Sequence, residues 1–344
     1  MFYAFLAIVG GVIGSGFITG KEIAVFFARN GLFAFVGAIF STIFFFFLFK
    51  YFLFHGEKVA SLLASSKMFL FISILLNVIL SASMIAGIVD ISCEAGEMAS
   101  LIIIITLISC LFVFKKGIRA LDNFNMALVP LMIVVFVIIF LPKISLNFHF
   151  AKGGIISSLW FSILYTVLNI ANMTLLLSSL GAKLRKKQKT QVAFWATLAL
   201  GILLLLVVAV LLQNQSVIGQ DMPLLSLVNS WQKVVMSGLI FLGSVTSLFS
   251  FVYASSSSLR GLNKNEMINF FLSILLPLII SFLGFGFIVT YIYPLASVLG
   301  ILLLGMIFLP RLFFNPFLKY ANKKIHSSCK RAKQNDTGHD DVKF

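Results

Sequence analysis

Charge is scarce in this sequence. Asp, Glu, Lys and Arg together make up 11% of the 344 residues, less than half of the share of about 25% that is usual in globular domains. Hydrophobic residues make up 60%, and the mean hydropathy is +1.08. A soluble core cannot absorb that much apolar surface, so the composition predicts a membrane protein with many spans.

Residue clusters that carry catalysis or bind metals are missing as well. The three cysteines, Cys93, Cys110 and Cys329, are far apart and odd in number, so neither a disulfide framework nor a metal-ligand spacing follows. The predicted spans contain almost no ionisable side chain, so general acid–base and metal catalysis have no visible carrier. We therefore predict that the chain is not an enzyme and uses no cofactor.

Long apolar segments are what the sequence has in abundance. A hydrocarbon core about 30 Å thick needs roughly 20 helical residues, and ten segments meet that test. These predicted spans are residues 2–28, 32–54, 68–90, 99–114, 119–142, 154–181, 192–212, 233–257, 266–284 and 286–309. The sequence thus predicts an all-α fold of about ten transmembrane helices, with a turn at Gly284–Gly286 and a kink at Pro294 in the last one.

The distribution of the +15 net charge predicts the orientation. Most of the basic residues lie in the loops after the second, fourth, sixth and eighth spans and in the tail, whereas the opposite side carries the acidic Asp90, Glu94, Glu97 and Asp221. The positive-inside rule predicts that both termini lie in the cytoplasm. We expect the protein to be located in the plasma (inner) membrane. Because the charge is spread over loops and forms no compact patch, we expect no nucleic-acid partner. The basic tail, residues 311–344, is expected to be a disordered extension, with contact to anionic lipid as the alternative.

Glycines are concentrated in the first span, "IVGGVIGSGFITGKEIAVFF". Glycine weakens a helix by about 1 kcal/mol relative to alanine, so we expect this helix to be interrupted at Gly14–Gly16, with Thr19 and Glu22 on its second half. An interruption exposes carbonyls of the first half and N–H groups of the second half, which can bind a cation and a carboxylate. The alternative is close helix packing, because Gly11 and Gly14, and likewise Gly16 and Gly20, are spaced for it.

Three other spans place polar residues at mid-depth. In the sixth span Tyr165, Asn169 and Asn172 share one helix face, and they either line a cavity or bond to neighbouring helices. The third span has Asn77, Ser81 and Met84 on one face. The eighth span has an adjacent Thr246 and Ser247, whose hydroxyls either ligate sodium or bond back to their own helix.

At these places the chain resembles a known family. "GSGFITGKE" resembles the signature G-x-GFASGQE in the first span of the YkvI-type bacterial membrane proteins, and "SMIAGIVD", "LYTVLNI" and "IYPLASVLG" resemble runs in later spans. The resemblance covers about residues 5–310. Two departures are Ile18-Thr19 in place of Ala-Ser and Lys21 in place of Gln. The family is similar to the amino acid–polyamine–cation superfamily, whose LeuT-like fold has two inverted five-helix repeats and breaks in the first and sixth helices.

The resemblance implies a domain organisation and a set of site residues. One transmembrane domain would cover residues 1–310, with one repeat at about 1–142 and the other at about 153–310. A sodium site would be formed by the carbonyls of Gly10, Ile13 and Gly243 and the hydroxyls of Thr246 and Ser247. The substrate would touch Gly14, Ser15, Gly16, Ser81, Tyr165 and Asn169. Glu22, the ionisable residue that comes closest to the interior of a predicted span, lies a few residues beyond the glycines and is the candidate for coupling.

These observations lead to two hypotheses on function. The first is a secondary transporter of a small organic solute, amino-acid-like or otherwise zwitterionic or neutral, coupled to Na+ or H+ and working by alternating access. It accords with the absence of a nucleotide-binding loop and with the polar lining at mid-depth. The second is a small-molecule receptor or assembly subunit on the same fold, similar to spore-germination receptors.

Overall fold

The computed structural model describes residues 1–94, 106, 118–144, 153–259 and 265–309. All regular elements in these ranges are helical, and no strand occurs among them. Within the described ranges, six helices are long and apolar enough to cross a membrane, and three shorter apolar helices accompany them. The prediction of a helical membrane protein is therefore confirmed, whereas the count of ten spans and the inverted repeat stay predictions. Nearly all of the fourth predicted span and the whole predicted tail lie outside the described residues.

Helices coincide with the other nine predicted spans. They are α1 (Phe2–Val12), α2 (Ser15–Ile18), α3 (Lys21–Phe26), α4 (Phe33–Ser65), α5 (Lys67–Glu94), α7 (Ile118–Phe140), α8 (Ile155–Lys183), α9 (Lys186–Gln213), α10 (Ser230–Leu259), α11 (Glu266–Ser281), α12 (Phe285–Phe287) and α13 (Tyr293–Phe308). The first three belong to one predicted span, and α12 and α13 belong to another. Residues Met1–Leu303 pack as one compact unit, and the contacts below lie within it.

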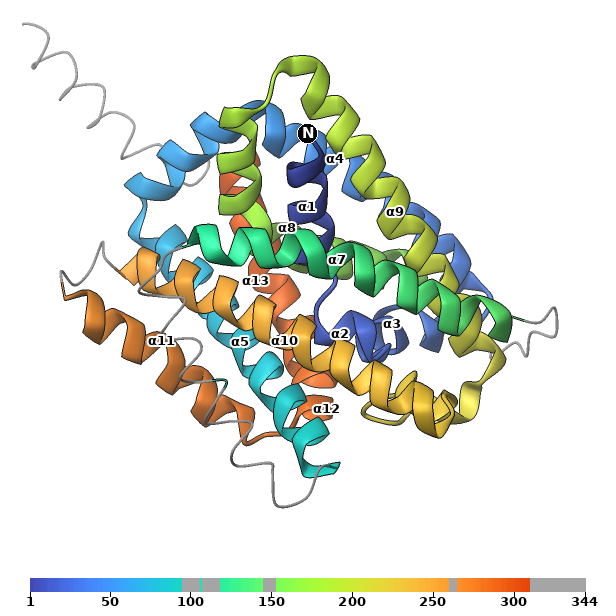
Figure 1. The fold of residues 1–344 in the computed structure, drawn as a ribbon. Coiled ribbons are helices and arrows are strands. Elements are labelled where there is room, and N and C mark those ends of the chain that lie inside the picture. The colour runs from blue at the N-terminus through green and yellow to red at the C-terminus, as the bar shows by residue number, and fades with distance from the viewer. Residues whose placement is uncertain (95–105, 107–117, 145–152, 260–264, 310–344) are drawn as a thin grey trace, which may run out of the picture. The chain divides into compact units, whose positions relative to one another are not determined.

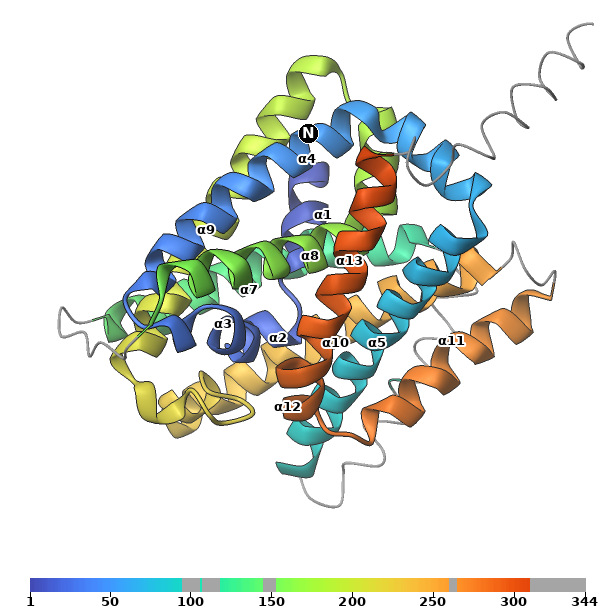
Figure 2. The same ribbon diagram turned by 180° about the vertical axis from the view of Figure 1, so that it is seen from behind.

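The first helix and its continuation occupy the middle of this unit. In Figures 1 and 2, α1 runs behind α7 from one side and behind α8 from the other, and it contacts α7, α8 and α9. The short α2 packs against α5 and α10, and α3 packs against α8 and α9. The segment that the sequence marks as unusual is thus enclosed by the longer helices.

The most extensive helix pair is α4 with α8, and small residues let the two backbones touch. A Cβ added to Gly56 would stand 2.5 Å from the Ser178 carbonyl oxygen, and one added to Gly181 would stand 2.5 Å from the Leu53 carbonyl oxygen. Real Cβ atoms do not come that close, so both positions require glycine. This is the small-residue packing that membrane helices use in place of a hydrophobic driving force.

The predicted turn before the last span is present, and a π-helical turn lies close to the proline where a kink was predicted. The chain turns at Gly284, which has φ +84°, a left-handed conformation that suits glycine. A π-helical turn occupies Ile288–Ile292, directly before Pro294. Proline has no N–H to donate and its ring crowds the preceding turn, and local π geometry is one way in which a membrane helix accommodates this.

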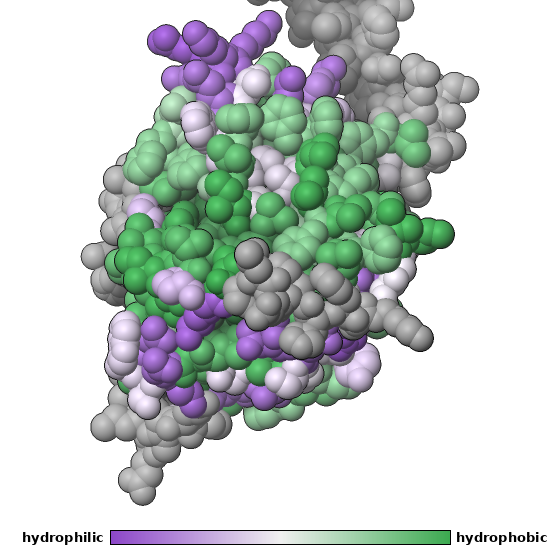
Figure 3. Space-filling view, turned by 90° about the vertical axis from the view of Figure 1, so that its right-hand side faces the viewer, coloured by the Kyte–Doolittle hydropathy of each residue, from purple (hydrophilic) through white to green (hydrophobic). Residues whose placement is uncertain are grey.

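The surface over α9 fits a membrane protein. Figure 3 shows a hydrophobic belt with hydrophilic residues gathered above and below it. Exposed apolar side chains on α9 include Phe194, Trp195 and Ile202, while Arg185 and Lys186 are exposed at the start of that helix. This pattern places the start of α9 at one edge of the hydrocarbon region.

Candidate functional site

The predicted interruption of the first helix is present. α1 ends at Val12, and Ile13 (φ −81°, ψ 80°) and Gly14 (φ −98°, ψ −171°) are not helical. The helix resumes at Ser15, so the break starts earlier in the chain than the sequence suggested, and Gly16 is already helical. The short α2 ends at Ile18, and α3 begins at Lys21, so the first span consists of three separate helices.

Both interpretations of the first-span glycines hold, each for different positions. A Cβ on Gly10 would stand 2.6 Å from Val129 Cγ2, and one on Gly11 would stand 2.7 Å from Met173 Cε, so these two serve close packing. Gly14 forms the break, and Gly20 (φ +78°) lets the chain turn between α2 and α3.

The break leaves backbone groups available for a ligand. Among the described residues, the structure gives no hydrogen-bond donor to the carbonyl oxygens of Gly10, Gly11 and Ile13. In contrast, the oxygens of Val9 and Val12 accept bonds from the N–H groups of the break residues. Ile13 is buried, while Gly10 and Gly11 are half-buried, and carbonyls without a donor within the hydrocarbon region are costly unless they face a ligand or water. Two of the three predicted carbonyl ligands, Gly10 and Ile13, are therefore in a suitable state to hold a cation.

The eighth span contributes one hydroxyl to this region. The Ser247 Oγ lies 3.7 Å from the position that a Cβ on Gly14 would take, so α10 faces the break. The Thr246 hydroxyl instead donates to the Gly243 carbonyl at 3.0 Å. Ser247 and the break are thus brought together, while Thr246 and Gly243 are bonded to each other within α10.

The predicted substrate residues on α5 and α8 carry buried hydroxyls without partners. Among the described residues, neither Ser81 Oγ nor Tyr165 OH has a hydrogen bond, although both residues are almost fully buried. The Tyr165 ring lies 5.0 Å from the ring of Phe27 and 5.7 Å from that of Phe26. A buried polar atom without a partner calls for a ligand or a water.

The remaining predicted substrate residues are bonded to protein atoms. Asn169 donates from Nδ2 to the carbonyl oxygen of Tyr165 at 3.0 Å, a bond within its own helix. Ser15 donates to Met84 Sδ at 3.1 Å, which joins α2 to α5. The resemblance also implied a broken sixth helix, and this expectation is wrong, because α8 continues without interruption from Ile155 to Lys183. No glycine or proline lies in its middle to break it.

Glu22 lies at the centre of this arrangement. It is 6% exposed, and its carboxyl packs directly on Gly16, where an added Cβ would overlap Oε1 and stand 2.6 Å from Cγ. Its helix, α3, packs against α8, which carries Tyr165, and against the π-helical turn that precedes Tyr293. No basic side chain among those described pairs with it. A carboxyl in this position requires a proton or a bound cation to neutralise it.

Two residues of this cluster were missed by the sequence interpretation. Tyr293, which the sequence marked only as the neighbour of a kink, is fully buried and forms a hydrogen bond with Ser83 Oγ. Ser83 follows Ser81 by two residues on α5. A mid-span tyrosine next to a proline was the available signal, but nothing in the spacing indicated which helix it would meet.

A loop covers the second break. Lys21, 3% exposed, donates from Nζ to the carbonyl oxygen of Gln220 at 2.7 Å and to that of Gly219 at 3.3 Å, and its Nζ lies 3.4 Å from Asp221 Oδ1. The amide of Leu224 donates to the carbonyl oxygen of Thr19 at 2.9 Å. Lys21 therefore holds the 219–224 loop over the junction of α2 and α3. Beside this loop, a cavity of about 340 Å³ is lined by residues including Asp90 and Asp221.

Replacing Lys21 by Met is expected to loosen this loop. The change removes donors from two carbonyls and the ion pair with Asp221, and hydrogen bonds to charged groups contribute about 1.5–3 kcal/mol each. The amide of Leu224 should then exchange with deuterium at least about tenfold faster, because local opening becomes easier. Lys187→Met, at an exposed position, is the control, and equal exchange in the two variants would contradict the role of Lys21.

Comparison with known proteins gives no relative. No family model matches the chain, and no curated protein matches it. The resemblance to the YkvI-type proteins therefore stays a prediction.

Proposed function

We propose that the chain is a secondary transporter of a small organic solute, zwitterionic or neutral, that is driven by Na+ or H+ through alternating access. The observation that carries the proposal is the break in the first helix at the centre of the molecule. Among the described residues, three carbonyl oxygens at the break have no hydrogen-bond donor, and the Glu22 carboxyl has no basic partner. Ser81 and Tyr165, on the helices α5 and α8 that pack against α2 and α3, have hydroxyls without partners within the same described part of the chain. Helices broken beside polar groups are how transporters build substrate and ion sites inside a bilayer. The resemblance to the YkvI-type proteins supports the same function. The proposal also includes a location in the plasma membrane with both termini in the cytoplasm, which follows from the distribution of basic residues.

Two routes of coupling fit this site. Sodium would be held by the carbonyl oxygens of Gly10 and Ile13 with the hydroxyl of Ser247, all hard oxygen ligands. A proton would be held by Glu22, whose neutral form suits its buried position. Both groups border the same break, so occupancy of either one can change the balance between its conformations.

The test compares two neighbouring hydroxyls. Thermal stability of the purified protein is measured in sodium and in potassium, with and without pooled amino acids, amines and nucleobases. A ligand at a hundredfold excess over its Kd stabilises the folded state by about 2.7 kcal/mol. We expect Ser247→Ala to abolish a sodium-specific shift and Thr246→Ala to retain most of it, because the Thr246 hydroxyl is bonded to Gly243.

Counterflow in proteoliposomes then separates transport from sensing. A pool that stabilises the protein and also exchanges across the membrane supports a transporter. Binding without any flux contradicts transport and favours the receptor hypothesis. A shift that is equal in sodium and potassium, together with flux that follows a pH gradient, assigns the coupling to H+.

A further inference from the structure

A basic pocket lies between α4, α8 and α9, away from the site described above. It has a volume of about 220 Å³, and its lining includes the side chains of His55, Lys58 and Lys189 and the backbone of Gly56 and Gly181. Since a water occupies about 30 Å³ in the liquid, the pocket has room for a phosphate group and several waters. Three basic side chains around one hollow indicate an anionic ligand.

Helix packing gives this pocket a fixed floor. His55 has non-helical dihedral angles (φ −108°, ψ 18°), so α4 bends here and opens the hollow. Directly below, Gly56 and Gly181 hold α4 and α8 in backbone contact, each with an added Cβ only 2.5 Å from a carbonyl oxygen of the partner helix. The backbone contact between α4 and α8 therefore restricts how far the wall of the pocket can move.

The positive charges face the pocket without neutralising partners. The His55 ring stacks on Tyr51 at 4.5 Å and uses Nδ1 to contact the Tyr51 carbonyl oxygen at 3.1 Å, which leaves Nε2 for a ligand. Lys189 Nζ lies 5.6 Å above the Phe54 ring. Lys58 is exposed. Among the described side chains, no carboxylate forms an ion pair with these groups.

The start of α9 increases this positive charge. Its first turn contains Lys186, Lys187 and Lys189 and no acidic residue. The N-terminus of a helix carries a partial positive charge, which repels lysines placed there. A bound anion would reduce this repulsion and would also pair with the lysines.

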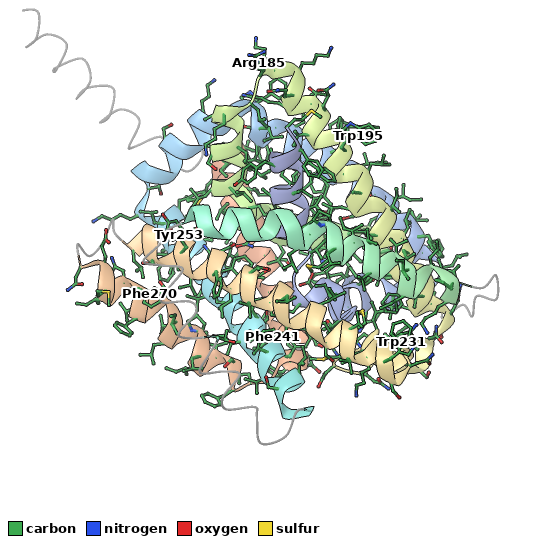
Figure 4. The ribbon with its side chains drawn as sticks, in the orientation of Figure 1. Arg185, Trp195, Trp231, Phe241, Tyr253 and Phe270 are labelled. Carbon is green, nitrogen blue, oxygen red and sulfur yellow. The ribbon has the colours of Figure 1, made fainter. Side chains whose placement is uncertain are left out.

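The location of the pocket selects the kind of anion. Figure 4 shows Arg185 at one end of the ribbon, with Trp195 below it on the side of α9. Trp195 is 52% exposed, as is typical of tryptophans at the membrane–water interface. Lys189 lies between the two in sequence, and Phe47 and Phe54 of α4 expose apolar surface that an acyl chain could cover. A pocket at this level meets lipid headgroups.

We propose that the pocket binds the phosphate group of an anionic phospholipid, with Lys58, Lys189 and His55 as its ligands. Basic pockets between transmembrane helices at the headgroup level recognise anionic lipids in this way. The phosphate lies against the lysine ammonium groups. Because His55 Nδ1 donates to the Tyr51 carbonyl oxygen, Nε2 donates to the phosphate in the form of the ring that carries both protons. The bound lipid ties α4 to α9 across the end of α8.

The test measures lipid binding directly by native mass spectrometry and by thermal stability in neutral detergent. Phosphatidylglycerol, phosphatidylcholine and inorganic phosphate are titrated separately. We expect phosphatidylglycerol to bind and stabilise the protein, phosphatidylcholine to bind weakly, and inorganic phosphate at the same concentration to do neither. The double variant Lys58→Ala/Lys189→Ala should lose about thirtyfold in affinity, since each lysine near the membrane surface contributes about 1 kcal/mol.

Lys50→Ala is the matched control. Lys50 lies on the same helix and also stands over a phenylalanine, Phe46, at 5.9 Å, but it does not line the pocket. It should therefore retain lipid binding. Equal binding of the two lipids, or an equal loss in Lys50→Ala, would overturn the proposal. Inorganic phosphate that competes as strongly as the lipid would show a site for free phosphate instead. Should the double variant fail to fold, Lys58→Gln and Lys189→Gln are measured singly.

Discussion

Glu22→Gln is expected to abolish ion-coupled uptake while the protein stays folded. The carboxyl of Glu22 is 6% exposed, packs on Gly16 and has no basic partner among the described side chains. Glutamine has nearly the same shape but can carry neither a proton nor a negative charge. We therefore expect uptake driven by an ion gradient to fall at least about a hundredfold, which corresponds to about 2.7 kcal/mol.

Stability provides the second half of this prediction. A buried carboxyl without a basic partner costs several kcal/mol whenever it is charged, whereas glutamine is neutral at every pH. The melting temperature of the glutamine variant should therefore equal that of the wild type where Glu22 holds a proton and exceed it where Glu22 is charged. Glu266→Gln, an exposed carboxyl in the first turn of α11, is the control and should leave both quantities nearly unchanged. Full coupled uptake by the Glu22 variant would remove Glu22 from the coupling role and leave the carbonyls and Ser247 as the ion site.

The sequence predicted the interruption of the first helix because backbone preference is a local property. Glycines at five positions made a continuous helix costly, and Gly14 and Gly20 do adopt the conformations that end helices. Spacing alone could not assign Gly10 and Gly11 to packing, because this depends on Val129 and Met173 from distant helices. The glycines therefore predicted that the first helix is interrupted, but they gave only the approximate position of the interruption.

Hydropathy located the spans but not the ends of the helices. α4 continues to Ser65, well past the predicted end at residue 54, and α9 starts at Lys186 rather than at residue 192. A helix continues as long as its backbone bonds are favourable, in water as well as in lipid, whereas hydropathy records only the part in hydrocarbon. The extra turns carry His55, Lys58 and Lys189, so the basic pocket lies in the part that hydropathy could not describe.

Contacts between distant segments were beyond the sequence. Lys21 binds a loop that lies about 200 residues away, and Tyr293 bonds to Ser83 across 210 residues. Periodicity reveals which residues share a helix face but not which helix that face meets. For the same reason the choice between a ligand role and an internal bond for Thr246 was open until the bond to Gly243 was seen.

Gly181→Ala is expected to destabilise the protein, because the added methyl group would clash with the backbone of α4. The added Cβ would stand 2.5 Å from the Leu53 carbonyl oxygen and 3.1 Å from its Cα, and backbone atoms of a packed helix cannot move aside as a flexible side chain can. Overpacking of this kind typically costs about 1–3 kcal/mol. In a protein of this size we expect the melting temperature in detergent to fall by several degrees, since about 1 kcal/mol corresponds to roughly 2–4 °C.

Gly238→Ala in α10 separates packing from helix propensity. No atom lies within 4 Å of its added Cβ, so the same substitution there meets open space. Alanine favours the helix over glycine by about 1 kcal/mol, and this variant should be at least as stable as the wild type. A fall of equal size in both variants would show that the methyl group at residue 181 does not meet α4. A lower melting temperature in Gly181→Ala alone would show that backbone contact between α4 and α8 stabilises the fold. The basic pocket would then lie beside a tightly packed contact between these two helices.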